Sequence, residues 1–138
     1  MGKTHQWIIF IGRMLLGLSF LGAGLAKIGV WDQLVTQLGR SPLKEAIGTE
    51  MIPVYLVFTI LLESVGGFLV CLGAKTRLAA ILLVVVMIVP VTMMHQFWHL
   101  SGQAFIQGYF RFLLDVKILG GILLLMAFGP GRFSVDRG

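Results

Sequence analysis

A glutamate stands in the middle of the apolar run "VFTILLESVGGFLV", and basic residues interrupt two other apolar runs of this chain. Glu63 is the acid and Arg13 and Lys117 are the bases, while Lys27 and His95 stand nearer the ends of their runs. A carboxylate between cations can hold a polar ligand and exchange protons with it. These five residues are the candidate ligand- or cofactor-binding pocket. The sequence does not identify catalytic residues.

Four long apolar runs must position these side chains. The chain has 138 residues, of which 57% are hydrophobic and 12% are charged, whereas a soluble domain has roughly 25% charged residues. Each run is near the ~20 residues with which a helix crosses the hydrocarbon layer. The sequence predicts an all-α integral membrane four-helix bundle, a single transmembrane domain over residues 1–138, with spans at about 7–28, 52–73, 77–97 and 109–128.

The charges within the spans are expected to point into the bundle, because a charged group at the bilayer centre costs roughly 2.5 to 3.5 kcal/mol. Glu63 is about 11 residues from either end of its span, while Arg13 is about 6 residues inside its own, or roughly 9 Å deep. Lys117 approaches the same depth from the opposite side. We therefore expect Glu63 to lie between Arg13 and Lys117.

Helical spacing places small residues on the same faces as these charges. One face of the first span holds Arg13, Gly17, Gly24 and Lys27, and one face of the second holds Thr59, Glu63, Gly66, Gly67 and Val70. Glycines on a membrane helix let its backbone approach a neighbour closely. We expect close helix packing along both faces.

The basic residues outside the spans predict the orientation. The side shared by both termini and the second loop carries Lys3, Lys75, Arg77, Arg132 and Arg137, and the other carries Arg40, Lys44 and Arg111. The positive-inside rule then places both termini in the cytoplasm. No basic face carries interleaved aromatic residues, so the positive charge reflects topology and nucleic acid is not an expected partner.

The connections have their own signals. "VWDQLVTQLGR" and "SPLKEAIG" predict two short interfacial helices in the first outer loop. In the second loop, Gly73 suits a helix C-terminal cap and Thr76 an N-cap. Lys3 followed by an apolar stretch is also compatible with a cleaved secretory signal, but Arg13 interrupts that stretch, so we expect the segment to be retained.

Histidine and cysteine suggest little independent chemistry. His95 and His99 are one helical turn apart, a spacing that can chelate a metal, but no third ligand is visible and no metal site is predicted. His95 is better explained as a hydrogen-bonding residue at the mouth of the polar core. Cys71 is the single cysteine, so an internal disulfide is excluded and a redox role would need a bound cofactor or a partner.

Several segments together resemble the DoxX-like family of small membrane proteins. They are "GRMLLGLSFLGAGLAKI", "LESVGGFLVCLGAKTRLAA" and the ending "GPGRFSVD". The resemblance implies a four-helix, multi-pass protein of the inner (cytoplasmic) membrane, linked to thiosulfate:quinone oxidoreduction. It matches Arg13, Lys27, Glu63 and, less strictly, His95 to the polar positions of that family.

The function is therefore interpreted as that of a redox-associated subunit that binds a quinone or a small oxidised metabolite in the polar pocket. If it were an enzyme it would be an oxidoreductase subunit that needs partners, since dinucleotide and CxxC motifs are missing from the sequence. Expected partners are the lipid bilayer, a second copy of the chain, or a membrane or soluble redox protein. The alternatives are a carrier of a small anion or metabolite, and a non-catalytic membrane scaffold in which the ion pairs are structural.

Overall fold

The chain is helical over the residues that the structure describes. The computed structural model describes residues 2–94 and 97–136, and no strand occurs among them. The elements in chain order are α1 (Lys3–Gly29), α2 (Trp31–Leu38), α3 (Pro42–Ile47), the 3₁₀ turn η1 (Thr49–Met51), α4 (Ile52–Leu72), α5 (Thr76–Val89), the π-helical η2 (Pro90–Met94), the 3₁₀ turn η3 (Phe97–His99) and α6 (Gly102–Phe128). The predicted all-α class is confirmed, and α2 and α3 are the two short helices expected in the first loop.

Among the residues that the structure describes, three helical stretches are long and apolar enough to cross a membrane. They are Lys3–Gly29, Thr49–Leu72 and the stretch that begins at Thr76. Helix α6 is as long as α1, but every stretch of 18 residues within it contains three charges, those of Arg111, Asp115 and Lys117. The structure thus confirms a multi-pass membrane protein with three apolar spans, and α6 lies where the fourth span is predicted.

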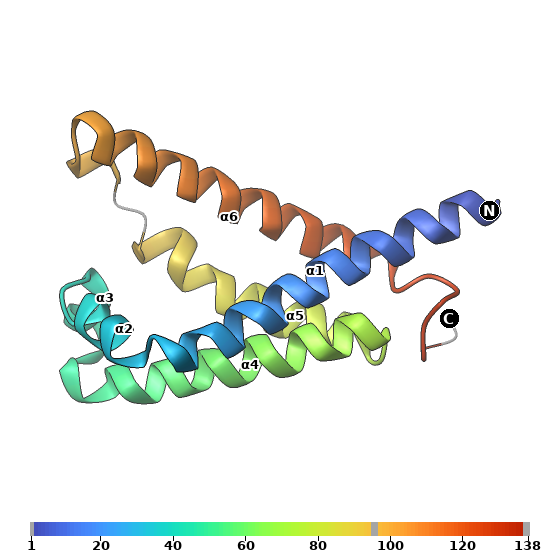
Figure 1. Cartoon of the computed structure of the whole chain (residues 1–138), viewed down its shortest axis with the longest axis horizontal. Coiled ribbons are helices and arrows are strands. Elements are labelled where there is room, and N and C mark those ends of the chain that lie inside the picture. Colours follow the sequence, from blue (N-terminus) through green and yellow to red (C-terminus); the bar gives the residue numbers. More distant parts are fainter. Residues whose placement is uncertain (1, 95–96, 137–138) are drawn as a thin grey trace.

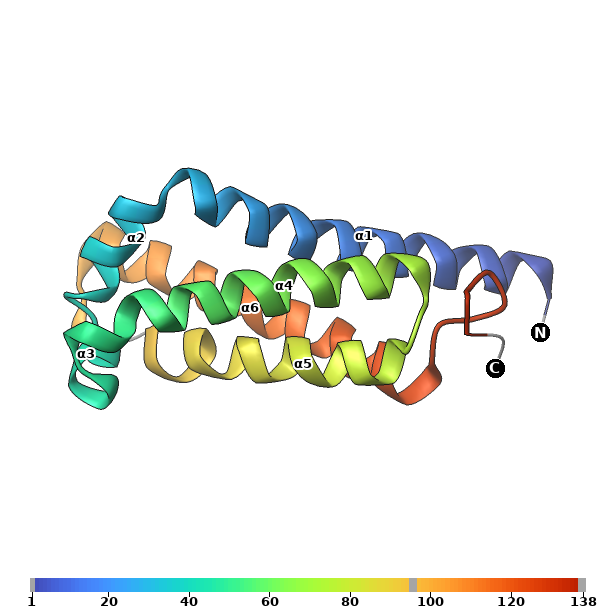
Figure 2. The ribbon, with the colours of Figure 1, turned by 90° about the horizontal axis from the view of Figure 1, so that it is seen from below.

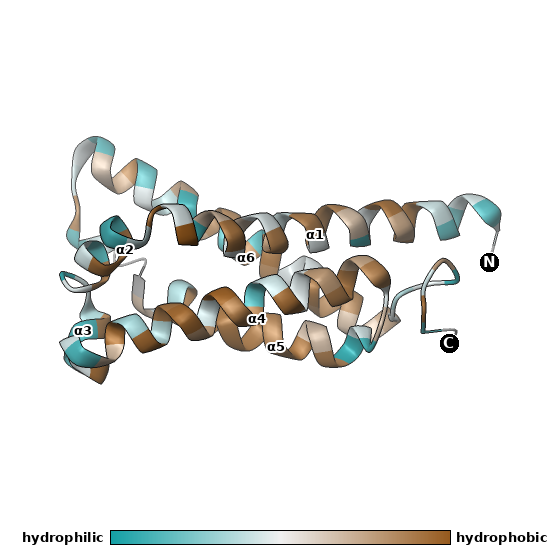
Figure 3. Cartoon of the chain, turned by 60° about the horizontal axis from the view of Figure 1, so that its bottom comes forward, coloured by the Kyte–Doolittle hydropathy of each residue, from teal (hydrophilic) through white to brown (hydrophobic). Residues whose placement is uncertain are grey.

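Helices α1, α4 and α5 run along one axis, α6 diverges from α1 toward one end of the molecule, and the short elements gather at that end (Figure 1). Both termini and the α4–α5 turn lie at the opposite end from α2 and α3 (Figures 1 and 2). We call these the terminal end and the loop end. Hydrophobic residues dominate the middle of the bundle, while hydrophilic residues concentrate at both ends (Figure 3). This distribution is that of a bundle that lies across a membrane.

Helices α1 and α4 pack antiparallel through the faces that the sequence predicts. Arg13, Gly17 and Gly24 of α1 are buried, as are all five predicted residues of the α4 face. A Cβ added at Gly17 would overlap the backbone at Gly67 and the side chain of Cys71, and one at Gly24 would overlap Ser64. The two backbones therefore touch without intervening side chains, as small residues permit in lipid.

The C-terminal tail closes over the α4–α5 turn. The carbonyls of Leu72 and Gly73 accept hydrogen bonds from Val135 N–H at 3.1 Å and Asp136 N–H at 2.8 Å. Gly73 is the left-handed C-cap of α4 (φ 67°), as predicted. The prediction for Thr76 was wrong, because it lies inside α5, after Lys75 as the N-cap residue. Its N–H donates to Asp136 Oδ2 at 2.9 Å, so a distant carboxylate replaces the local cap.

The same contacts affect the ionisation of Asp136. The backbone N–H groups of Lys75 and Thr76, together with the charge of Lys75, hold the pKa of Asp136 below its usual range. The tail is thus tied to the start of α5 by an ionised carboxylate at neutral pH.

Candidate functional site

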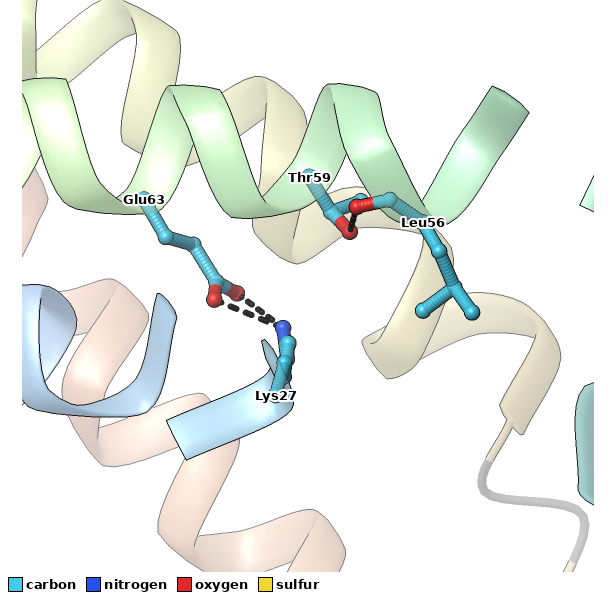
Figure 4. Close-up of polar contacts among 4 residues, drawn as sticks. All are labelled: Lys27, Leu56, Thr59 and Glu63. Atoms are coloured by element: carbon cyan, nitrogen blue, oxygen red, sulfur yellow. Dashed lines mark hydrogen bonds and ion pairs between the residues drawn. The ribbon is translucent and has the colours of Figure 1, made fainter. Parts of the chain in front are cut away.

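The centre of the candidate site is an ion pair between α1 and α4. Lys27 Nζ donates to Glu63 Oε1 at 2.7 Å and to Oε2 at 2.6 Å (Figure 4). The close packing at Gly24 places the last turn of α1 beside the middle of α4. A lysine in the last turn of a helix is also favoured by the helix dipole. The acid predicted to turn inward does so, and its partner is Lys27.

The two partners differ in their access to the surroundings. The side chain of Glu63 is 7% exposed and that of Lys27 is 27% exposed. Lys27 has three N–H groups and uses two on the carboxylate, so one remains for another acceptor. Nearby, the Thr59 hydroxyl donates to the carbonyl of Leu56 at 2.9 Å and not to the pair (Figure 4). The pair therefore presents a hydrogen-bond donor, the ammonium of Lys27, to its surroundings, while the carboxylate of Glu63 stays buried.

Arg13 does not neutralise Glu63, contrary to the expectation from span depth. Its guanidinium donates to the carbonyls of Pro130, at 2.8 Å, and Phe133, at 2.5 Å. Gly17, one turn further along α1, already packs against Gly67 and Cys71, and the guanidinium of Arg13 lies near Gly73, so Arg13 lies at the C-terminal end of α4 and not beside its middle. Arg13 is a structural clamp on the C-terminal tail.

Lys117 and His95 also fall outside the pair. Lys117 is exposed on α6, and within the described residues it forms no ion pair with Glu63. The expectation that Lys117 balances the acid from the opposite side is not met, because its side chain faces outward. His95 lies outside the described residues. In the part of the chain that the structure describes, no group of three or more histidine, cysteine, aspartate or glutamate residues is placed to hold a metal ion.

A cavity of about 730 Å³ opens beside the pair at the loop end. This volume falls in the roughly 300–1,000 Å³ of small-molecule sites. Lys27 lines the cavity, whereas Glu63 is not among its lining residues. Apolar walls come from α2, α4, η2, η3 and the residue that follows η3, with Leu34, Leu38, Leu56, Pro90, Phe97 and Leu100. The other polar groups on the wall are Gln37, Tyr55, Thr59, Gln107, Arg111 and Asp115.

Most of these wall residues could not be predicted from the sequence, because the wall is formed by six elements that meet only in the fold. Gln107 and Arg111 are one turn apart near the start of α6, which is a detectable pattern.

Gln6 is a further residue that the sequence did not predict to have a role. It is buried on α1, and its Oε1 accepts from Arg132 N–H at 2.9 Å, which fixes the tail again. No local signal around Gln6 marks this role, since its partner is 126 residues away.

Comparison with known proteins identifies relatives along the whole chain. A model of the SURF4 family matches residues 47–138. The inner membrane protein YphA of Escherichia coli (strain K12) is 26% identical over 136 residues, which cover 99% of this chain and 93% of YphA. The inner membrane protein YqjF of the same bacterium is 30% identical over 137 residues, with 99% and 95% covered.

A eukaryotic relative is similar over part of its length. The Surfeit locus protein 4 homolog of Schizosaccharomyces pombe is 33% identical over 130 residues, which cover 91% of this chain and 35% of the homolog. The chain therefore spans about a third of that relative. No solved structure matches the chain.

These matches correct the resemblance drawn from the sequence. The matching family is SURF4 and not the DoxX-like family. The prediction of a redox-associated subunit that binds a quinone depended on the DoxX-like family, and it was therefore wrong. The matches give no specific support to an anion carrier or a scaffold either. The glycine-rich helix faces in the segments that suggested the DoxX-like family are a general feature of packed membrane helices and do not identify a family.

Proposed function

The chain belongs to the SURF4 family, and we propose that it is a binding protein of the bacterial inner membrane that holds an uncharged amphipathic molecule in its loop-end cavity. The inner-membrane location is supported by the names of two relatives, the inner membrane proteins YphA and YqjF. The observation that carries the binding role is the cavity itself, whose wall includes the free donor of a buried ion pair.

The proposed topology is a single transmembrane domain of four spans with cytoplasmic termini. Three spans would leave the termini on opposite sides, but both lie at the same end of the bundle (Figure 1), which supports α6 as a fourth span. Exposed Lys3, Lys75, Arg77 and Arg132 lie near that end, which supports its cytoplasmic placement. Labelling of single cysteines at residues 2 and 33, in a Cys71→Ala background, tests the orientation. Modification of residue 2 from the outside would contradict it.

The charge of the cavity favours an uncharged ligand. Lys27 is neutralised by Glu63, and the wall also carries Arg111 and Asp115 with opposite charges. A net anion would gain little from such a site, and it would lose its hydration shell on entry. An ester, amide or hydroxyl oxygen of the ligand can instead accept a hydrogen bond from the remaining N–H of Lys27. The leucines and Phe97 of the wall can then cover the apolar part of the ligand.

The proposal is tested by the molecules that remain bound after purification. The intact protein is extracted in mild detergent and analysed by native mass spectrometry. We expect an uncharged amphiphile of one class among the molecules that remain bound to the wild-type protein. The double variant Lys27→Met/Glu63→Leu removes the donor without stranding a buried charge, and it should lose the ligand. Ala104→Phe, an exposed wall position, should lose it by filling the cavity.

A matched control is Lys117→Met, which removes an exposed cation away from the cavity and should retain the ligand. If both the double variant and Ala104→Phe keep wild-type ligand occupancy, the cavity is not the binding site and the proposal fails. Association of the chain with a second copy stays a prediction. The size of the particle in the same mass spectra tests it.

A further inference from the structure

A second groove, larger than the loop-end cavity, lies at the terminal end. It has a volume of about 1310 Å³ and runs between α1, the start of α5 and the end of α6. Its walls are apolar and open to the surroundings, with Leu15 67%, Leu124 61% and Phe128 78% exposed. Leu16 of α1 is the nearest side chain to Gly121 of α6.

The mouth of this groove is basic. Lys75, Arg77 and Arg132 line it and are exposed, and none of the three forms an ion pair within the described residues. The acid at this mouth, Asp136, accepts hydrogen bonds from the start of α5. Three cations against one carboxylate leave the mouth positive. Arg13, which lies deeper, is already occupied by tail carbonyls.

We propose that the terminal-end groove is a binding site for an anionic phospholipid. The phosphate lies among Lys75, Arg77 and Arg132 at the membrane surface, and an acyl chain lies along Leu15, Leu124 and Phe128. Basic pockets between membrane helices bind anionic head groups, and here the basic mouth and the apolar wall belong to one continuous groove. A free phosphate would use only the mouth, and an uncharged lipid only the wall.

This site differs from the loop-end cavity in both position and charge. The loop-end cavity contains compensated charges and suits an uncharged ligand, whereas the terminal-end groove has uncompensated cations at its mouth. The lipid site is therefore independent of the function proposed above. A failure at one site leaves the other standing.

The test is native mass spectrometry of the full chain titrated with dioleoyl phosphatidylglycerol, with dioleoyl phosphatidylcholine as the uncharged-head-group comparison. We expect tighter binding of phosphatidylglycerol. Each surface cation contributes about fivefold in affinity, so Lys75→Gln/Arg77→Gln should weaken phosphatidylglycerol binding by about 25-fold. The matched control, Arg40→Gln/Lys44→Gln, removes two exposed cations at the loop end and should change it by less than about twofold.

A further variant tests the apolar wall. Leu124→Gln places a polar group on the exposed wall and should weaken phosphatidylglycerol binding without unfolding the protein, as checked by its melting temperature. Equal affinity for the two lipids, full binding by Lys75→Gln/Arg77→Gln, or full binding by Leu124→Gln would each overturn the proposal. Complete displacement of the lipid by glycerol 3-phosphate would assign the mouth to a free anion, and chain-to-chain cross-links at residue 124 would assign the groove to a second copy. Both results would also overturn it.

Discussion

Removal of one member of the Lys27–Glu63 pair should destabilise the bundle far more than removal of both. Breaking a buried ion pair costs about 3–5 kcal/mol, because the remaining charge stays buried without a partner. In Lys27→Met the stranded group is Glu63, whose side chain is only 7% exposed, so we expect a loss near the lower bound, about 3 kcal/mol. In Glu63→Leu the stranded ammonium keeps 27% exposure and can recover some hydration, and we expect about 2 kcal/mol.

The double variant Lys27→Met/Glu63→Leu leaves no buried charge at this position. Apolar replacement of a buried pair is often neutral or stabilising, so its stability should lie within about 1 kcal/mol of the wild type. The two single losses would sum to about 5 kcal/mol if the sites were independent, so the coupling between them should be at least about 4 kcal/mol. Unfolding in mixed micelles of dodecyl sulfate and a mild detergent, followed by tryptophan fluorescence, measures all four proteins.

A double variant destabilised by the sum of the single losses would show that the two residues act independently, and the ion pair would then have no energetic role. Lys117→Met is the control. Its side chain is exposed, and its stability should change by less than about 0.5 kcal/mol.

Three further predictions concern the tail and the helix contact. Arg13→Met removes two charge-assisted hydrogen bonds to the tail, each worth about 1.5–3 kcal/mol, and limited proteolysis should cut the tail at least tenfold faster. An unchanged cleavage rate would exclude the clamp. Gly67→Val inserts a side chain against the α1 backbone, and this overpacking should lower the free energy of unfolding by about 1–3 kcal/mol. At Gly22 an added side chain enters open space, so Gly22→Val should be tolerated in the same unfolding assay. The lowered pKa of Asp136 means that its contribution is present above the ordinary aspartate range and is lost as the pH falls through the lowered pKa. Proteolysis of the tail should therefore accelerate only in acid, and Asp136→Asn should remove that acid dependence.

The sequence by itself determined the helical membrane architecture and the faces that pack. Runs of about 20 apolar residues have few alternatives to membrane helices. The cost of a charge in hydrocarbon turned Glu63 inward, and the periodic glycines marked the α1–α4 contact, at Gly17 and Gly67. These conclusions rest on local spacing, which the sequence contains.

Only the tertiary structure decided which cation meets the acid. The depth of each residue within its span predicts that Arg13 reaches Glu63. In the structure, however, the first turns of α1 extend past the C-terminal end of α4 (Figure 2). The contact of Gly17 with Gly67 and Cys71 sets this register. It places Arg13 beside Gly73, ten residues along the chain from Glu63, or about 15 Å along a helix axis.

The same limit applies to both candidate sites. The loop-end cavity and the terminal-end groove combine residues from several elements, and neither set has a spacing that marks it in the chain. Hydropathy fixes how deep a helix can lie in the membrane, but the sliding of one helix against another depends on side-chain interlocking across the interface. The register between α1 and α4 makes Lys27, and not Arg13, the partner of Glu63, and local sequence patterns carry no measure of that register.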